Sequence, residues 1–434
     1  MFFRSVGRGN PAWAAAVNVL NGWKARDSCQ SLDHNDPAAT PNLAWEVRLT
    51  YPKRTVRQHF ADAGPKRILA LDGGGLRGIL TLGILKKVED ELSQRHGSDA
   101  SFRLCDYFDL ISGTSTGAII AATLAIGWSV EDITKKYFEL GSHVFQRSLL
   151  RQGLLRAKYD ETRLIEQLQS VFGADTTLGS DNLQTGLLVV IKRLDSGSPW
   201  PVSNNPNGKY FRSREGGVIG NGDYKLWQAV RASTAAPDYF DPERVAIAES
   251  PGHPPVIGDF VDGGVSPFNN PAFQAFLYAT LHGYRINWPV GKDNILVTSV
   301  GTGAADPAVR RSEIAAAQAL RALVSLLDDC AALQETLLQW MSKSPTARSI
   351  DRELGTLDED LPAGAPLLSY VRYNVGLQPA EVRDLLGVEA DAVTVQDLSA
   401  MDAPENMLVL HRLGIAAGQR KVQSDHFPAA FDLK

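Results

Sequence analysis

From residue 66 onward the chain alternates short apolar runs with longer segments in which apolar residues recur at helical spacing. A short apolar run bounded by turn residues is typical of a buried strand, and the longer spacing is typical of an amphipathic helix. The predicted strands are Ile68–Leu71, Phe108–Ser112, Leu187–Lys192, Tyr210–Ser213, Asp259–Val261 and Ile295–Val300. The predicted helices are Ile79–Ser93, Ala118–Ile126, Val130–Leu140, Thr162–Phe172 and Ala272–Leu281.

This alternation predicts an α/β fold, a three-layer α/β/α sandwich around a mostly parallel sheet. Residues 65–305 are the predicted core of the sandwich. Ligands of such sheets bind outside the carboxyl ends of the strands. Residues that directly follow a strand are therefore the first candidates for a functional site.

The C-terminal segment, residues 306–434, is predicted to be a mainly helical cap packed on the core. A separate domain is the alternative. Its predicted elements are helices at Ser312–Leu327, Ala331–Met341 and Asp402–Leu413 and a strand at Leu367–Tyr373. The last of these helices opens with an N-cap residue followed by proline and glutamate, the usual order at a helix start.

Residues 1–64 precede the core as an appendage of unknown role. Arg4 and Arg8 come before the apolar run Ala12–Leu20, an order that is also found in signal peptides. Asn18 interrupts the run and no clear cleavage site follows, so we interpret it as a short amphipathic helix. The chain contains no run of about eighteen apolar residues, and we expect no transmembrane helix.

The composition is that of an ordinary globular protein, with 434 residues of which 44% are hydrophobic and 21% are charged. A net charge of −5 argues against nucleic acid as a partner and against a strongly anionic membrane surface. Cys29, Cys105 and Cys330 are too scattered for a disulfide framework or a zinc site. The sequence therefore predicts neither metal nor cofactor, and a reducing, cytoplasmic location.

The candidate nucleophile is Ser115, in the sequence Gly-Thr-Ser-Thr-Gly between a predicted strand and a predicted helix. This is a G-x-S-x-G motif in the strand–turn–helix context of a nucleophile elbow. Gly113 and Gly117 let the strand and the helix pack closely around a strained turn. The following helix directs its positive dipole end to the place where an oxyanion would form, which favours acyl transfer.

A second glycine-rich turn, Asp72–Gly78, reads Asp-Gly-Gly-Gly-Leu-Arg-Gly and also joins a predicted strand to a predicted helix. Consecutive glycines leave backbone N–H groups accessible, and the helix N-terminus adds its dipole, so the turn predicts an anion cradle. The anion is either a phosphate or the oxyanion of an acyl transfer. Because both glycine-rich turns follow strands, we expect them to share one crevice.

Four motifs, and their order along the chain, resemble those of the patatin-like phospholipases. They are Asp72–Gly78, Gly113–Gly117, Arg231–Phe240 and Asp262-Gly263-Gly264. The resemblance covers about residues 66–305. It implies a patatin-like fold and a lipid acyl hydrolase of the phospholipase A or lysophospholipase type, which cleaves carboxylic esters of membrane phospholipids during peripheral contact with the membrane. Some bacterial members of the family are defence effectors that degrade membrane lipid in response to a nucleotide signal. The resemblance therefore also implies a small nucleotide activator as a candidate partner.

The resemblance also implies roles for individual residues. Ser115 is the expected nucleophile, and Asp262 is the expected base, acting on the serine directly without a histidine. The expected oxyanion donors are the backbone N–H groups of Gly73, Gly74, Gly75 and Leu76. The residues that complete the motifs are Arg77, Gly78, Gly113, Gly117, Gly263 and Gly264. An aspartate of ordinary pKa is a weak base for a serine hydroxyl, so geometry and partial burial have to compensate.

Other interpretations of the same residues stay open. An α/β-hydrolase triad would combine Ser115 and Asp262 with His282 or His411. Asp259 is a second candidate for the base, and the Asp-Gly pair at 262 is also a common turn dipeptide. The loop Asp195–Asn207, which is polar and carries Trp200, is either a solvated surface loop or a lid.

The turn Gly73–Gly78 also satisfies G-x-G-x-x-G, the dinucleotide-binding fingerprint. That fingerprint needs an acidic residue at the end of a second strand, about twenty positions on. Glu89, Asp90 and Glu91 lie at the expected distance but inside the predicted helix. The dinucleotide interpretation also leaves the Ser115 motif unexplained.

Overall fold

The computed structural model describes residues 51–97, 100–144, 161–214, 216–237, 239–305, 315–388, 395 and 397–434. The predicted N-terminal helix lies outside these residues. The described strands are β1 Lys66–Leu71, β2 Leu110–Thr114, β3 Gly186–Arg193, β4 Pro199–Ser203, β5 Glu243–Ala248, β6 Val256–Asp262, β7 Ile295–Val300, β8 Ala304–Ala305, β9 Ser342–Lys343, β10 Leu368–Tyr373 and β11 Gly376–Leu377. The described α-helices are α2 Val56–Ala61, α3 Gly78–Arg95, α4 Leu104–Tyr107, α5 Thr116–Ala125, α6 Val130–Val144, α7 Glu161–Phe172, α8 Leu226–Ser233, α9 Ala272–Thr280, α10 Ala315–Trp340, α11 Pro379–Leu386 and α13 Met407–Lys421.

A nine-stranded sheet forms the centre of the described part of the chain, in the order β5-β6-β3-β2-β1-β7-β10-β9, with β4 also paired to β3. Strands β3, β2, β1, β7, β10 and β9 run parallel to one another. Strands β4 and β6 run antiparallel to β3, and β5 runs antiparallel to β6. Every residue of β1, β2 and β7 is buried, because a parallel sheet has helices on both faces, and this explains why the strands do not alternate between apolar and polar residues.

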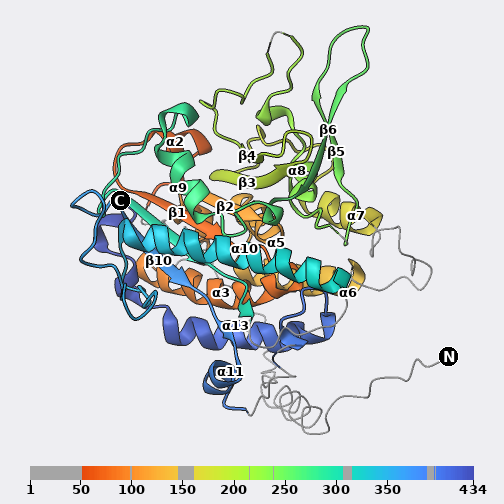
Figure 1. Ribbon diagram of the computed structural model, residues 1–434. Coiled ribbons are helices and arrows are strands. Elements are labelled where there is room, and N and C mark those ends of the chain that lie inside the picture. Colours follow the sequence, from red (N-terminus) through yellow and green to blue (C-terminus); the bar gives the residue numbers. More distant parts are fainter. Residues whose placement is uncertain are drawn as a thin grey trace, which may run out of the picture.

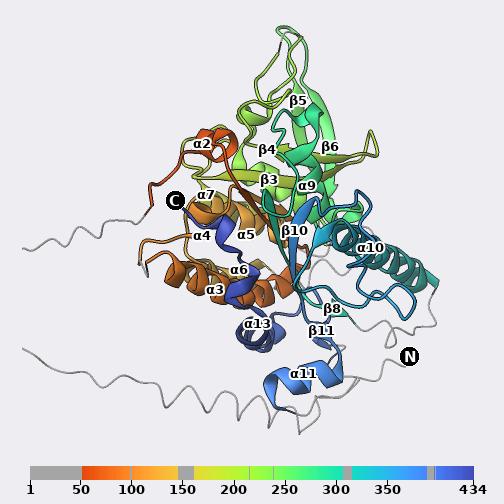
Figure 2. The same ribbon diagram turned by 90° about the vertical axis from the view of Figure 1, so that its left-hand side faces the viewer.

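Helices cover both faces of this sheet (Figures 1 and 2). Helices α3, α5, α6, α7 and α8 supply the larger hydrophobic core on one face. On the other face a smaller core lies between the strands of the sheet and α9, with Phe60 of α2 and Leu338 of α10. The predicted three-layer α/β/α sandwich around a mostly parallel sheet is confirmed.

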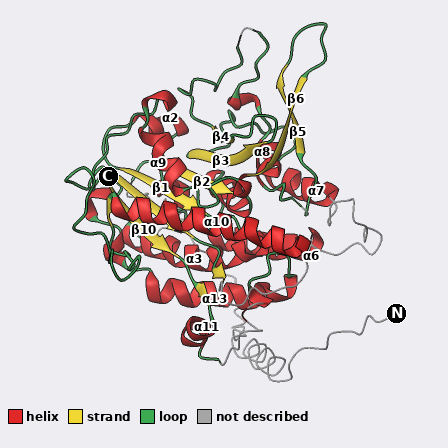
Figure 3. Ribbon diagram, viewed as in Figure 1, coloured by secondary structure: helices red, strands yellow, loops and turns green. Residues whose placement is uncertain are grey.

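The C-terminal segment is mainly helical and is joined to the sheet (Figure 3). Its strand β10 pairs with β7 along Ser369–Tyr373, which confirms the predicted strand there. The segments predicted as two helices, Ser312–Leu327 and Ala331–Met341, belong to one helix, α10, where the structure describes them. Helix α13 packs along α3, the helix that follows the first glycine-rich turn, and continues to Lys421, beyond the predicted end at Leu413.

Two predictions around β3 are wrong. The expected loop Asp195–Asn207 contains β4, which pairs with β3 from Leu188 to Lys192. Prolines at 199 and 201 disguise this strand, but proline is tolerated there because β4 has no second neighbour among the described strands. The expected strand Tyr210–Ser213 is a series of turns, and Tyr210 is exposed.

The described helices include none that combines the length and the apolar character required to cross a membrane. The described Cys, His, Asp and Glu side chains likewise form no group of three that could hold a metal ion.

Candidate active site

Ser115 lies at a sharp turn between the end of β2 and the start of α5. Its backbone φ and ψ are 55° and −125°, a conformation that costs free energy for any residue with a Cβ and is found where function requires it. The flanking glycines allow the turn, because a Cβ on Gly113 would lie 2.2 Å from the carbonyl oxygen of Gly117. A Cβ on Gly117 would lie 2.1 Å from the carbonyl oxygen of Leu71. The structure therefore has the strand–turn–helix geometry of a nucleophile elbow.

Strand β3 brings Asp262 to this turn. Thr114, the last residue of β2, pairs with Val190, and Asp262, the last residue of β6, pairs with the next residue, Ile191. Strand β4 pairs with the same part of β3, so it occupies the opposite edge. Strands β2 and β6 therefore lie on one edge of β3 and meet end to end, with Ser115 and Asp262 at the junction.

The two side chains are in direct contact. Ser115 Oγ donates a hydrogen bond to Asp262 Oδ2 at 2.5 Å, and the N–H of Gly264 donates to Asp262 Oδ1 at 2.7 Å. Ser233 links the turn to β3. Its Oγ accepts a hydrogen bond from the N–H of Ser115 at 2.9 Å and donates one to the carbonyl oxygen of Val190 at 2.7 Å. Both oxygens of the carboxylate are thus oriented, one of them toward the serine.

The environment of Asp262 strengthens it as a base. Its side chain is 5% exposed. Burial raises the pKa of Asp262 to about 6, although the hydrogen bonds from Ser115 and Gly264 and the charge of the buried Arg231 act in the opposite direction. A carboxylate with this pKa is still mostly ionised at neutral pH and accepts a proton more readily than an ordinary aspartate.

The alternative bases lie elsewhere. Asp259 is half exposed, and its carboxylate lies 3.5 Å from Nε of Arg244. His282 is exposed in the short helix η5 (His282–Tyr284) that follows α9. His411 lies on α13 with its ring edge-on to Phe138. Within the described part of the chain, neither the Ser115 nor the Asp262 side chain is hydrogen-bonded to a histidine.

The predicted oxyanion donors divide into two pairs. The N–H of Gly73 donates to the carbonyl of Asn269 at 3.1 Å, and the N–H of Leu76 donates to the carbonyl of Met401 at 2.8 Å. The N–H groups of Gly74 and Gly75 have no acceptor within the described part of the chain. The structure therefore narrows the expected set of four donors to these two glycines.

Residues from distant segments hold the turn in place. Thr302, which follows β7, donates from Oγ1 to the carbonyl of Gly73 at 3.0 Å. Tyr137 of α6 donates to the carbonyl of Gly75 at 2.7 Å. Nothing local in the sequence marks Asn269, Thr302, Tyr137 or Met401, because each acts through a contact made across the fold.

The remaining motif residues have structural positions near the site. Arg77 is buried in the short helix η2 (Gly75–Arg77), and Gly78 begins α3. A Cβ on Gly78 would lie 2.6 Å from Oγ1 of Thr116, so the N-termini of α3 and α5 meet at the two glycine-rich turns. Both helix dipoles therefore have their positive ends at the same place. A Cβ on Gly263 would lie 2.2 Å from the carbonyl oxygen of Val190, which requires glycine at the β2–β6 junction.

The positions of Glu89, Asp90 and Glu91 argue against the dinucleotide interpretation. Glu89 is buried inside α3, and its carboxylate accepts the N–H of Val130 at 3.2 Å. Asp90 and Glu91 are ion-paired with lysines one helical turn earlier. None of these three carboxylates ends a second strand, so the ribose contact of that fingerprint is missing.

A buried ion pair links the glycine-rich turn to the C-terminal segment. Asp72 accepts two hydrogen bonds from Arg372 of β10, at 2.9 and 2.6 Å, and both side chains are buried. Arg372 also donates to Oγ of Ser299 at 2.7 Å. The C-terminal segment thus fixes the first residue of the turn.

We expect Arg372→Leu to lower the free energy of unfolding by about 3–5 kcal/mol, because it leaves the Asp72 carboxylate buried without a partner. Urea unfolding of the variant and the wild type measures this difference. The double variant Arg372→Leu with Asp72→Asn, which removes the orphaned charge, should recover part of the loss. An Arg372→Leu variant as stable as the wild type would contradict the prediction.

Comparison with known proteins agrees with this geometry. Residues 69–276 match the family model of the patatin-like phospholipases. The chain is 29% identical over 240 residues to a cGAMP-activated phospholipase of Escherichia coli, and the alignment covers 54% of this chain and 62% of that protein. It is 30% identical over 250 residues to a cGAMP-activated phospholipase of Vibrio cholerae, and this alignment covers 54% of this chain and 64% of that protein.

A plant protein, patatin-17 of Solanum cardiophyllum, is 31% identical over 239 residues, covering 52% of this chain and 56% of that protein. The chain therefore spans less than two thirds of the length of each of these relatives. The matched region begins in β1 and ends within α9, so it includes both glycine-rich turns, Ser115 and Asp262. Residues 69–276 of this chain are a patatin-like phospholipase domain.

Proposed function

We propose that this chain is a lipid acyl hydrolase that cleaves carboxylic ester bonds of membrane phospholipids with Ser115 and Asp262 as a catalytic dyad. The observation that carries the proposal is the hydrogen bond of 2.5 Å from Ser115 Oγ to Asp262 Oδ2 at the strained turn. The N–H groups of Gly74 and Gly75, in the neighbouring turn, support it. A serine with an adjacent base and oriented donors is what acyl transfer requires.

In the first half of the proposed reaction, Asp262 accepts the proton of Ser115 while Oγ attacks the carbonyl carbon of the ester. The carbonyl oxygen becomes an oxyanion and accepts hydrogen bonds from Gly74 and Gly75. The intermediate then collapses, and the alcohol, a lysophospholipid, leaves with the proton from Asp262. In the second half, Asp262 accepts a proton from water, and the oxygen of that water attacks the acyl carbon on Ser115. The bond from Oγ to the acyl carbon then breaks, the fatty acid is released and Asp262 returns the proton to Ser115 Oγ.

The test is an assay on vesicles of phosphatidylethanolamine and phosphatidylglycerol, with the products identified by mass spectrometry. We expect free fatty acid and lysophospholipid in equal amounts, and neither product from Ser115→Ala. Release of a phosphorylated head group or of diacylglycerol would instead indicate cleavage of a phosphoester and would overturn the proposal.

We further propose that a small nucleotide activates the enzyme. Two relatives that each align with 54% of this chain are described as cGAMP-activated, which supports this idea. The vesicle assay with and without cGAMP tests it, and an unchanged rate would contradict it for this nucleotide.

We propose the cytoplasm as the location of the protein, supported by the free Cys105 and Cys330. We also propose residues 306–434 as a cap on a catalytic core of residues 65–305, supported by the packing of α13 on α3.

Catalysis should depend on pH through Asp262. The base must be ionised, so kcat/KM should fall about tenfold per pH unit below the pKa of about 6 and level off above it. A short-chain soluble ester, assayed from pH 4.5 to 8, avoids changes in the lipid surface. Tryptophan fluorescence at each pH confirms that the protein stays folded. A profile that stays flat down to pH 4.5 would contradict a base with this raised pKa.

A further inference from the structure

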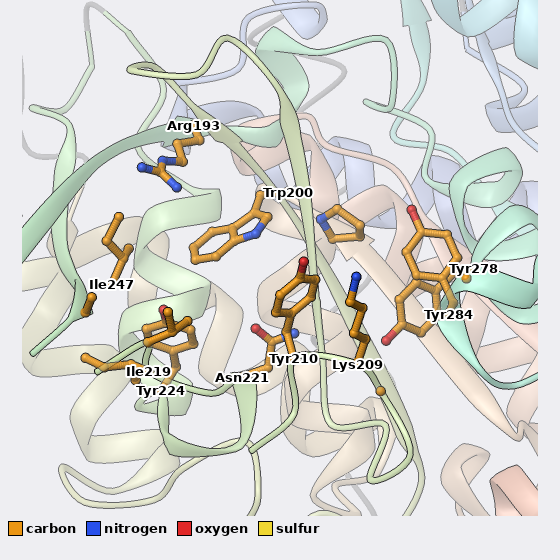
Figure 4. A pocket seen from close by; sticks show the side chains of 15 residues that line it. Arg193, Trp200, Lys209, Tyr210, Ile219, Asn221, Tyr224, Ile247, Tyr278 and Tyr284 are labelled. Carbon is orange, nitrogen blue, oxygen red and sulfur yellow. The ribbon is translucent and has the colours of Figure 1, made fainter. Parts of the chain in front are cut away.

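A cavity of about 540 Å³ lies beside β4 (Figure 4). Its lining includes Arg193, Trp200, Lys209, Tyr210, Asn221 and Tyr224. We call this cavity the β4 pocket. Its volume lies within the range of roughly 300–1,000 Å³ that is usual for small-molecule sites. Ser115, Asp262 and the turn Gly73–Gly78 are not among its lining residues, so the proposed reaction leaves the pocket without a role.

The lining of the β4 pocket combines aromatic rings and two cations with aliphatic side chains. In Figure 4 the ring of Trp200 lies between Arg193 and Tyr210, with Lys209 beside Tyr210. Tyr224 meets Trp200 edge-on at 5.7 Å between ring centroids. Asp and Glu are absent from the described residues that line the pocket, and the charged ones are Arg193 and Lys209. The cations lie over the rings, with Arg193 6.0 Å from the centroid of Trp200 and Lys209 5.3 Å from the centroid of Tyr210, so aromatic rings and positive charge adjoin each other in the pocket.

This combination fits a planar, anionic ligand. An aromatic base stacks on tryptophan or tyrosine, and a phosphate is attracted to lysine and arginine. The amide of Asn221 supplies a donor and an acceptor for the edge of a base. Oδ1 of Asp195 lies 2.6 Å from Nε of Arg193, and this ion pair offsets part of the arginine charge. Lys209 is therefore the principal partner for an anion. Apolar side chains such as Ile219 and Ile247 also line the pocket, and the preference for a nucleotide over a lipid tail rests on Lys209 and Asn221, which an acyl chain would leave without a partner.

The β4 pocket is connected to the catalytic aspartate through β3 and β6. Ile191 of β3 pairs with Trp200 on one side and with Asp262 on the other. The Trp200 ring stacks on Phe260 with 4.8 Å between centroids and 9° between planes. Phe260 precedes Asp262 by two residues on β6, so both side chains point to the same face of the sheet. A ligand that moves Trp200 therefore acts on the strand that positions Asp262.

We propose that the β4 pocket binds a nucleotide, with its base against Trp200 and Tyr210 and its phosphate at Lys209, and that the bound nucleotide changes the rate of ester hydrolysis through Phe260 and β6. The regulatory half rests on the proposed hydrolase function, whereas the binding half does not. Binding and hydrolysis are accordingly measured separately.

Calorimetric titration of the full chain with cGAMP, ATP and GTP measures binding. We expect at least one of the three to bind with a Kd well below about 1 mM. The double variant Lys209→Gln with Tyr210→Ala should weaken that binding by at least about tenfold, because it removes one charge and one stacking face. Tyr210 is 53% exposed, so the fold should tolerate its replacement.

Three controls separate the possible failures. Lys292→Gln removes an exposed lysine outside the pocket and should leave Kd unchanged. Ser115→Ala should abolish hydrolysis but bind the nucleotide within about twofold of the wild type, which keeps binding measurable even if the hydrolase proposal fails. Melting temperatures of all variants confirm that they are folded.

In the wild type, the bound nucleotide should change the rate of hydrolysis of a soluble ester, and the double variant should lose this change at the same nucleotide concentration. Failure of all three nucleotides to bind would overturn the proposal. Equal binding by the double variant and the wild type would also overturn it. Binding that depends on Lys209 and Tyr210 but leaves the rate unchanged would overturn the regulatory half.

Discussion

A Ser115→Ala variant is expected to lose ester hydrolysis by at least about ten-thousandfold, the scale seen when a nucleophile is removed from a serine hydrolase. The substitution deletes only the oxygen that donates to Asp262 Oδ2 and leaves the Cβ in the same strained turn. The melting temperature should therefore stay close to that of the wild type. Hydrolysis of a soluble ester and labelling by a fluorophosphonate probe measure the loss.

Ser170→Ala is the matched control, because Ser170 is an exposed serine on α7. This variant should keep both the activity and the labelling of the wild type. If Ser115→Ala retained activity, or if the probe labelled another residue in it, the assignment of the nucleophile would be wrong. A variant that melted well below the wild type would have to be compared at a temperature where both are folded.

Asp262→Asn should be nearly as damaging as Ser115→Ala. Asparagine retains an oxygen for the N–H of Gly264 but has no basic group to accept the serine proton. Because the two residues act as one unit, the double variant should be no slower than the worse single variant. Kinetics of both single variants and the double variant on one soluble ester test this expectation. Losses that multiplied in the double variant would show that the two side chains act independently.

Two histidine variants separate a dyad from a triad. His282→Ala and His411→Ala should each retain most of the activity, because His282 is exposed beyond α9 and His411 packs against Phe138. In a triad the histidine moves the proton, and its loss is as severe as loss of the serine. Collapse of activity in either variant, at unchanged melting temperature, would favour the α/β-hydrolase triad over the dyad.

Local sequence is sufficient to predict the strand–turn–helix units of this protein. The Ser115 turn and the turn Asp72–Gly78 each lie within a short stretch, and their glycines, apolar runs and helical spacing are all close in the chain. Steric requirements of a tight turn act between neighbouring residues, so a contiguous motif expresses them. For the same reason, the alternation of strands and helices predicts the three-layer sandwich.

Elements whose local signals conflict with their environment are predicted poorly. Strand β4 contains two prolines and reads as a loop, yet an edge position beside β3 accommodates it. The segment Tyr210–Ser213 has aromatic residues typical of a strand but pairs with none of the described strands, and it forms turns beside the β4 pocket. Pairing with another strand, which depends on distant residues, decides both cases.

The sequence by itself determined that Ser115 sits at an elbow and that glycine N–H groups follow β1, because adjacent residues decide both. Only the tertiary structure decided which groups lie together. Asp262 reaches Ser115 because β2 and β6 end at successive residues of β3, Val190 and Ile191. Met401, from the C-terminal segment, engages the N–H of Leu76 and so helps to determine which donors stay free. Strand register and contacts between distant segments arise from the packing of the whole chain, and no short stretch of sequence contains them.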